Sequence, residues 1–208
     1  MSLILAIAIS YLIGSIPTAY IFGKLSKGLD IRQHGSGNVG ATNVFRVLGK
    51  GPGSIVLALD IIKGILPIVL VSSLFGIVAV WQIILLGVAG VVGHNWTVFL
   101  NFKGGKGIAT SLGVLIGLTI KFAVIRPVLI WTILIWLGCF LISGFVSLSS
   151  IVAATCLPII MVLTNQSLEI VFLGVVFCIF VVLRHRPNIK RLLNGEEPKV
   201  ALPFLKKK

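Results

Sequence analysis

The sequence predicts an all-α integral membrane protein, and three observations support that prediction. Hydrophobic residues make up 57% of the chain and charged residues only 11%, whereas soluble domains average about 45–50% apolar and about 25% charged residues. The mean hydropathy is +1.13. The apolar residues gather into long runs, and most of the charged residues lie in the connections between those runs. This pattern is typical of helices that cross a bilayer.

Seven apolar segments can be separated along the chain. They cover residues 2–22, 54–76, 77–100, 107–122, 127–142, 148–163 and 168–183. Several of the later segments hold about 16 residues, or roughly 24 Å of helix, against a hydrocarbon core of about 30 Å. We therefore expect about seven transmembrane helices, some of them short, in a single membrane-embedded domain that covers residues 1–208.

The basic residues predict the orientation of these helices. If the N-terminus lies outside, 15 of the 18 Lys and Arg residues fall in connections on the inner side, and only Lys121 and Arg126 fall on the outer side. Because Lys and Arg are enriched in cytoplasmic connections, the C-terminus is expected in the cytoplasm. The polar segments 25–53, 101–106 and 184–208 then share the cytoplasmic face.

The formal net charge of +13 does not indicate nucleic-acid binding here. Such binding needs a solvated basic face on a soluble fold, and these charges lie in short connections between apolar runs. Anionic lipid headgroups or an anionic substrate are the partners that this distribution favours.

Within the first polar segment, the run 34–46 combines small, flexible and hydrogen-bonding residues with one arginine, Arg46. Its glycines are Gly35, Gly37 and Gly40, and its neutral donors are Ser36, Asn38, Thr42 and Asn43. The glycine spacing matches a dinucleotide fingerprint, but that motif needs a preceding strand, and an apolar helix precedes it here. Exposed N–H groups and an arginine fork are suited to holding phosphate at a membrane surface. The alternative is a flexible polar loop that caps a helix.

The second polar segment, taken with its flanking residues as Gly93–Thr110, and the third segment are also basic. Lys103 and Lys106 lie among three glycines, just before a helix expected to begin near Ile108, so positive charge and N–H groups meet at a helix N-terminus. The third segment contains His185 and Asn188, which would share a face if this stretch is helical. Taken alone, the third segment is a basic tail next to the membrane.

Taken together, the three segments resemble one family. The patterns are Ser-Gly-Asn-x-Gly-Ala-Thr-Asn-x-x-Arg from Ser36, Gly-His-x-x-x-x-Phe-Leu-x-Phe-Lys-Gly-Gly-Lys-Gly-x-Ala-Thr from Gly93, and His-Arg-x-Asn-Ile-x-Arg-Leu-x-x-Gly-x-Glu from His185. This combination resembles the bacterial acyl-phosphate:glycerol-3-phosphate acyltransferases, the PlsY family. Departures are Val39, where the family often has proline, and Trp96-Thr97, which replaces an aromatic-proline pair.

The resemblance implies a seven-helix enzyme of the bacterial inner membrane with its active site on the cytoplasmic side. It would transfer an acyl group from acyl phosphate to the 1-hydroxyl of sn-glycerol 3-phosphate, giving lysophosphatidic acid and inorganic phosphate, the first step of phospholipid synthesis. No metal, cofactor or acyl-CoA is implied. The partners are then the two substrates and membrane lipids. The sequence does not determine the oligomeric state, and a monomer is compatible with it.

These expectations lead to a hypothesis for the site. The residues proposed to hold acyl phosphate are Ser36, Gly37, Asn38, Gly40, Thr42 and Asn43, those for glycerol 3-phosphate are Arg46, Lys106, Ser143, His185 and Asn188, and those for catalysis are Ser36, Asn38, Arg46, Lys106 and His185. Acyl phosphate is already activated, so binding and charge stabilisation would supply most of the catalysis. A substrate phosphate would take the proton of the attacking hydroxyl, and the rival hypothesis is that His185 acts as the general base.

Two further points stay open at this stage. A transporter of phosphate or another organic anion would also need basic, glycine-rich segments, although inverted repeats are not evident. Asp60 and Lys63 are expected within the second span, where charges are costly, so they should face the interior of the bundle. They either pair only with each other or also orient the first polar segment or Lys106.

Overall fold

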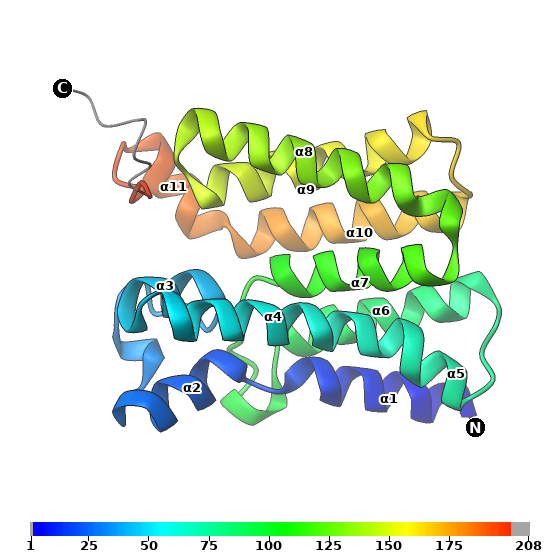
Figure 1. The fold of residues 1–208 in the computed structure, drawn as a ribbon, viewed down its shortest axis with the longest axis horizontal. Coiled ribbons are helices and arrows are strands. Elements are labelled where there is room, and N and C mark those ends of the chain that lie inside the picture. Colours follow the sequence, from blue (N-terminus) through cyan, green and yellow to red (C-terminus); the bar gives the residue numbers. More distant parts are fainter. Residues whose placement is uncertain (1, 201–208) are drawn as a thin grey trace. The chain divides into compact units, whose positions relative to one another are not determined.

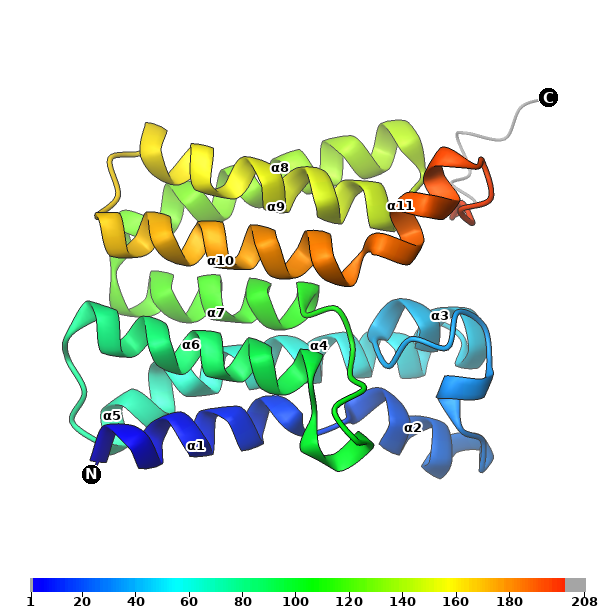
Figure 2. The same cartoon turned by 180° about the vertical axis from the view of Figure 1, so that it is seen from behind.

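The structure is a computed structural model that describes residues 2–200, and every regular element in that range is helical (Figures 1 and 2). The chain divides into two compact units, Met1–Ala123 and Val124–Lys208. The main helices of the first unit are α1 (Ser2–Ser15), α2 (Thr18–Lys27), α3 (Ala41–Leu48), α4 (Lys50–Leu66), α5 (Ser72–Leu74), α6 (Val80–Asn95) and α7 (Ile108–Lys121). Those of the second unit are α8 (Arg126–Ser143), α9 (Val146–Leu163), α10 (Leu168–Arg184) and α11 (Arg186–Leu193).

Within residues 2–200, five stretches of helix are long and apolar enough to cross a membrane. They are Ser2–Lys27, Lys50–Leu74, Val80–Leu100, Ala123–Ser143 and Val146–Leu163. A sixth span is present if α10 and α11, which meet at a bend of 60°, are counted as one. The remaining apolar helix, α7, has 14 residues. The prediction of an all-helical integral membrane protein is therefore confirmed, with five or six candidate spans.

Helix boundaries differ from the apolar segments where proline or polar residues intervene. The first segment is not one continuous helix, because Pro17 lacks an N–H group and the chain breaks between α1 and α2. The second span begins earlier than expected, since the polar turn from Lys50 precedes its apolar part, and it widens into a π-helical turn at Pro67–Val71. Hydropathy identifies apolar stretches, but it does not show where a helix breaks or widens within such a stretch.

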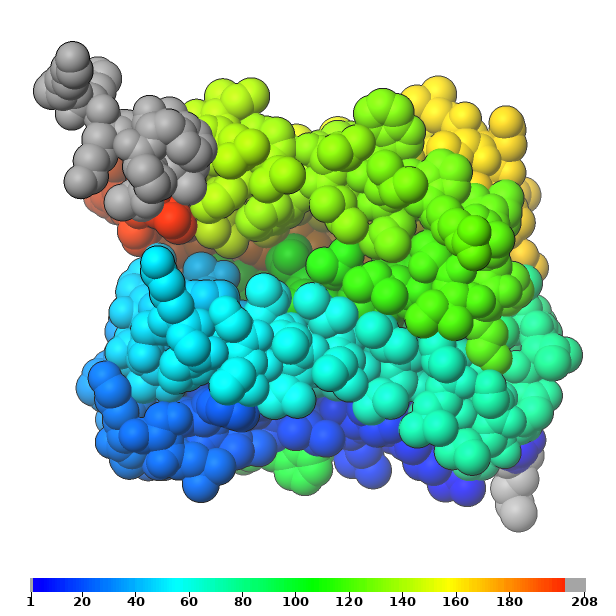
Figure 3. Space-filling view, in the orientation of Figure 1, coloured from blue at the N-terminus to red at the C-terminus, as the bar shows by residue number. Residues whose placement is uncertain are grey.

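Glycines allow the helices of the first unit to pack closely. Helix α1 packs against α6, and α4 packs against α7. A Cβ atom on Gly14 would clash with the carbonyl oxygen of Gly90, and one on Gly113 would clash with that of Ile61. Small residues at these positions let the helices approach closely, as is typical of packing within a membrane. In the space-filling view, α3 and α4 form most of the front of this unit (Figure 3).

We predict that Gly113→Ala destabilises the protein, because a methyl group at this α4–α7 contact has no room. The expected loss is about 1–3 kcal/mol, measured as a lower melting temperature in detergent. The matched control is Gly138→Ala in α8, where, among residues 2–200, no atom outside the local helix backbone lies within 4 Å of the added Cβ. Alanine there should leave the melting temperature unchanged or raise it slightly. Equal melting temperatures for the two variants would contradict the packing role.

The second unit is an antiparallel helical layer in which α9 packs against both α8 and α10. Gly144 ends α8 in a left-handed conformation (φ 74°), which turns the chain directly into α9. Trp136 of α8 donates a hydrogen bond to the Ser150 hydroxyl of α9 (3.2 Å). Residues 194–200 then return to the α8–α9 turn, where the Val200 N–H donates to the Gly144 carbonyl (2.9 Å). This turn is therefore the place where the third polar segment meets the rest of its unit.

Candidate active site

The first polar segment forms a loop that leads into the N-terminus of α3. Gly40 is the residue before the helix, and the N–H groups of Asn43 and Val44 donate to its carbonyl (3.0 and 3.3 Å). The N–H groups of Ala41 and Thr42, the first two residues of α3, lie at the positive end of the helix dipole. Thr42 and Arg46 are both exposed and lie one turn apart on α3. Hydroxyl, N–H and guanidinium donors are thus presented together, as an anion site requires.

Asn43 holds this loop in shape. Its side chain is buried, its Oδ1 accepts from the N–H of Ser36 (2.8 Å), and its Nδ2 donates to the carbonyls of Ile31 (3.2 Å) and His34 (3.0 Å). Gly35, at φ 62°, makes room for this contact, because a Cβ atom there would overlap the Asn43 amide. The sequence analysis proposed Asn43 as a ligand of the phosphate. In the structure, the side-chain amide of Asn43 forms hydrogen bonds with the backbone of the loop.

The other arginine of the segment, Arg32, has a local partner. Its guanidinium pairs with Asp30 (2.6 Å) and lies 5.1 Å from the centre of the Tyr20 ring. The hydrogen bonds from Arg32 lower the pKa of Asp30 to about 2. Since both groups are near solvent, the pair adds little stability. These contacts hold the Arg32 guanidinium beside Asp30 and Tyr20. Arg46, by contrast, lies on the exposed face of α3.

The second polar segment folds back over the end of α6. After the 3-10 helix η3 (Val98–Leu100), the N–H groups of Gly104 and Gly105 donate to the carbonyls of Asn95 (3.1 Å) and His94 (3.0 Å). Figure 2 shows this excursion between α6 and α7. A Cβ atom on Gly104 or Gly105 would clash with His94, so there is room only for glycine at these two positions. Helix α7 begins at Ile108 as predicted, with Lys106 half-buried just before it.

The structure brings the first two polar segments together within the first unit. A Cβ atom on Gly105 would lie only 2.7 Å from the carbonyl oxygen of Val39. Leu100 of the second segment shares a buried hydrophobic cluster with Val39 and Val44 of the first. The backbone before Lys106 therefore runs beside the loop that contains Ser36, Gly37, Asn38 and Gly40, close to the N-terminus of α3.

The third polar segment lies in the second unit, at the bend between α10 and α11. His185 is buried, and its Nδ1 lies 2.8 Å from the carbonyl of Val181. A carbonyl only accepts hydrogen bonds, so Nδ1 carries the proton and Nε2 is the atom that can exchange one. Asn188, in the first turn of α11, is also buried. Ser143 lies at the end of α8, where its hydroxyl accepts from the Phe145 N–H (3.2 Å).

Glu197 anchors this segment, and sequence reasoning gave it no role. One carboxylate oxygen accepts from Ser147 (2.7 Å) and Asn188 (2.7 Å), and the other accepts from Arg191 (2.7 Å). Burial alone would raise the pKa of Glu197, but these hydrogen bonds and the charge of Arg191 outweigh it and lower the pKa. The spacing Gly-x-Glu at the end of the third pattern was the available sequence signal. In residues 2–200, no three His, Cys, Asp or Glu residues form a group that could hold a metal ion.

Comparisons with known proteins agree on one family. A family model described as glycerol-3-phosphate acyltransferase matches residues 4–195. A glycerol-3-phosphate acyltransferase of Trichormus variabilis is 44% identical over 93% of this chain and 90% of its own length. A protein of Moorella thermoacetica named glycerol-3-phosphate acyltransferase 2 is 46% identical, over 95% of this chain and 97% of its own length. The corresponding Aquifex aeolicus protein is 42% identical over 95% and 98%, respectively.

Two crystal structures of PlsY, an integral membrane glycerol 3-phosphate acyltransferase, are similar to this chain. The glycerol 3-phosphate form has a TM-score of 0.87 and 39% sequence identity, and the alignment covers 100% of both chains. The lysophosphatidic acid form has a TM-score of 0.84 and 39% identity, and the alignment covers 97% of this chain and 96% of the other.

Proposed function

This chain belongs to the glycerol-3-phosphate acyltransferase family, and we propose that it transfers a fatty acyl group from acyl phosphate to the 1-hydroxyl of sn-glycerol 3-phosphate. Lysophosphatidic acid and inorganic phosphate are the products. The observation that supports this most strongly is that Gly105, next to Lys106, lies against Val39 in the loop that leads into α3. The exposed face of α3 carries Thr42 and Arg46. Donors of this kind suit a phosphate-bearing substrate.

The reaction needs little activation by the protein. The 1-hydroxyl oxygen attacks the acyl carbonyl carbon, the bond from that carbon to the phosphate oxygen breaks, and phosphate leaves with the electron pair. The hydroxyl proton passes to a phosphate oxygen of a substrate, so no side chain has to act as base. Ser36, Asn38 and the loop N–H groups stabilise the charge that develops on the donor. No metal or cofactor takes part.

The proposed roles of the residues are assigned for each unit by itself. In the first unit, the loop residues Ser36, Gly37, Asn38 and Gly40 with Thr42 hold acyl phosphate, and Asn43 supports that loop from behind. Arg46 and Lys106 bind the phosphate of glycerol 3-phosphate. In the second unit, His185 and Asn188 are assigned to glycerol 3-phosphate because they belong to the third pattern. Ser143 is assigned to it because it lies at the turn between α8 and α9.

The proposed topology has seven crossings, with the N-terminus outside and the C-terminus in the cytoplasm of a bacterium. The five long spans, the bent α10–α11 pair and the short apolar helix α7 make up the seven. The excess of Lys and Arg on one side supports this orientation, which places the active site at the cytoplasmic face of the inner membrane. We treat the whole chain as a single acyltransferase domain.

The test is phosphate release by the detergent-purified protein supplied with palmitoyl phosphate, with and without sn-glycerol 3-phosphate. We expect phosphate release that depends on the acceptor, together with lysophosphatidic acid in equal amount. Palmitoyl-CoA, as the control donor, should give no product. Product from palmitoyl-CoA alone would refute the acyl phosphate assignment. Absence of turnover with either donor would favour transport of an anion instead.

The His185→Gln variant separates the two hypotheses for the base. Glutamine can donate and accept hydrogen bonds at this buried position, but it cannot take up a proton. If a substrate phosphate is the base, the KM for glycerol 3-phosphate should rise about tenfold, the loss expected for one hydrogen bond to a charged group, while kcat stays nearly unchanged. A fall in kcat of about 10²-fold or more, with little change in KM, would identify His185 as the base.

A further inference from the structure

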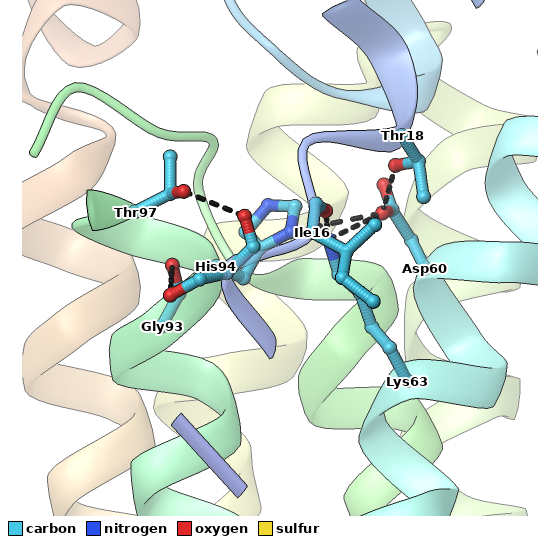
Figure 4. A network of polar contacts seen from close by, with 8 residues as sticks. Ile16, Thr18, Asp60, Lys63, Gly93, His94 and Thr97 are labelled. Carbon is cyan, nitrogen blue, oxygen red and sulfur yellow. Dashed lines mark hydrogen bonds and ion pairs between the residues drawn. The ribbon is translucent and has the colours of Figure 1, made fainter. Parts of the chain in front are cut away.

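At the break between α1 and α2, two backbone carbonyls accept hydrogen bonds from side chains of other elements (Figure 4). Pro17 has no N–H group, so the helical ladder is interrupted at this point. The carbonyl of Ser15 accepts from the hydroxyl of Thr97 (2.5 Å). The carbonyl of Ile16 accepts from the Lys63 ammonium (3.0 Å). A residue from the second polar segment and one from α4 therefore converge on the same break.

Asp60 completes this arrangement. Its Oδ1 accepts from the Thr18 hydroxyl (2.6 Å) and pairs with the Lys63 ammonium (2.8 Å), while Nδ1 of His94 lies 3.7 Å away. The side chains of Asp60 and Lys63 are only 1% and 6% exposed. Buried charges are tolerated when they are paired and hydrogen bonded. The expected mutual pairing is present, but each charge also bonds to the break, so the pair does more than neutralise itself.

The same break makes additional contacts with α6 and the turn that follows it. The Ser15 hydroxyl donates to the carbonyl of Gly93 (3.3 Å), and the Tyr11 hydroxyl donates to that of Trp96 (2.7 Å). On the other side of the break, α2 leads to the loop of the first polar segment, and Ala19 of α2 belongs to the hydrophobic cluster that also contains Val44 and Leu100. Both polar segments are thus connected to one buried network.

We propose that Asp60, Lys63, Thr18 and Thr97 are positioning residues that fix the first polar segment, with Arg46, relative to the second, with Lys106. This rests on the proposed function, which gives Arg46 and Lys106 their common substrate. The network acts through the backbone at residues 15–18, because that is where its hydrogen bonds end. A rigid support of this kind preorganises groups that must meet a substrate in a fixed geometry.

The decisive variant is the double replacement Asp60→Asn with Lys63→Met. Lys63→Met alone leaves a buried carboxylate without its cation and should unfold readily, whereas removing both charges is often neutral for stability. The double variant should therefore melt near the wild-type temperature while its KM for glycerol 3-phosphate is raised about tenfold or more. If the pair only stabilises the fold, the double variant will regain both the melting temperature and the wild-type KM, and the proposal fails.

Thr97→Val gives an independent test without any change in charge. We expect a similar rise in KM, with recovery in Thr97→Ser, which restores the hydroxyl. Thr119→Val is the matched control, because the Thr119 hydroxyl bonds only to its own helix at Ile116 (2.7 Å), and it should keep the wild-type KM. A wild-type KM in Thr97→Val would overturn the role of Thr97.

Hydrogen exchange separates this proposal from the proposed function, because it needs no substrate. In Thr97→Val and in the double variant, amides at residues 93–107 should exchange at least about tenfold faster than in the wild type, well below the melting temperature. Unchanged exchange would refute the positioning role even if the enzyme is active. Faster exchange in a protein that shows no acyl transfer would support the network and refute only the proposed function.

Discussion

Replacing Arg46 with alanine is expected to lower kcat/KM for glycerol 3-phosphate by about 10²- to 10³-fold, the loss typical of removing one preorganised donor from a charged reacting group. Arg46 lies on the exposed face of α3, one turn after Thr42 and in the last turn of that helix. An arginine here can offer two parallel N–H donors to one phosphate. Arg46→Lys keeps the charge without the fork, so its loss should be smaller, about tenfold.

Arg32→Ala is the matched control for this prediction. Arg32 belongs to the same polar segment, but its guanidinium is engaged by Asp30 and the Tyr20 ring. Its removal takes away one positive charge near the membrane surface and should leave kcat/KM within about twofold, because exposed ion pairs contribute little. If Arg32→Ala and Arg46→Ala lose the same activity, general charge attraction, and not a specific phosphate contact, would explain the effect.

The sequence was sufficient to predict an all-helical membrane protein, although seven spans were expected and residues 2–200 contain five or six candidates. Lipid offers no hydrogen-bond partners, so a segment that crosses it forms a helix in which the backbone N–H and C=O groups bond to each other. Long apolar runs therefore mark the membrane helices. The start of α7 at Ile108 was predicted correctly because charged and glycine-rich residues end abruptly there. The sequence does not show which residue each membrane glycine packs against, such as Ile61 for Gly113.

The direction in which polar side chains point could not be predicted. Asn43 and Thr42 are neighbours with similar chemistry, yet Asn43 turns inward to the loop backbone and Thr42 is exposed. That difference depends on the phase of α3 and the path of the preceding loop, which are tertiary properties. Pro17 did give a local signal for the break in the first span. What the sequence could not show is that Lys63 and Thr97, far away along the chain, occupy the carbonyls at that break.

Glu197 illustrates the same limit and leads to the second large effect. Glu197→Gln keeps the size of the side chain but removes the charge that accepts from Asn188, Ser147 and Arg191. Losing a hydrogen bond to a charged group costs about 1.5–3 kcal/mol. If Asn188 then moves from its place, the KM for glycerol 3-phosphate should rise by about 10- to 100-fold, as measured in the phosphate-release assay. Glu196→Gln is the matched control, because Glu196 is adjacent and exposed.

The pH dependence of stability provides a second measurement on the same residue. The pKa of Glu197 is lower in the folded protein than its ordinary value of 4.5. A carboxylate of this kind stabilises the fold fully above its unfolded pKa, and the stabilisation is lost as the pH falls through the lower, folded value. The melting temperature of the wild type should therefore fall as the pH drops below about 4.5. Asp30, with its pKa of about 2, contributes to the same loss.

Because Asp30 is present in both proteins, the difference between wild type and Glu197→Gln isolates the contribution of Glu197. The variant should melt at a lower temperature than the wild type at neutral pH, and the two melting curves should converge as the solution is made acidic. Glu196→Gln should follow the wild type throughout. A constant difference between Glu197→Gln and the wild type, from neutral pH to the acid range, would mean that the ionised carboxylate is not what anchors Asn188, and that the loss arises from packing of the side chain instead.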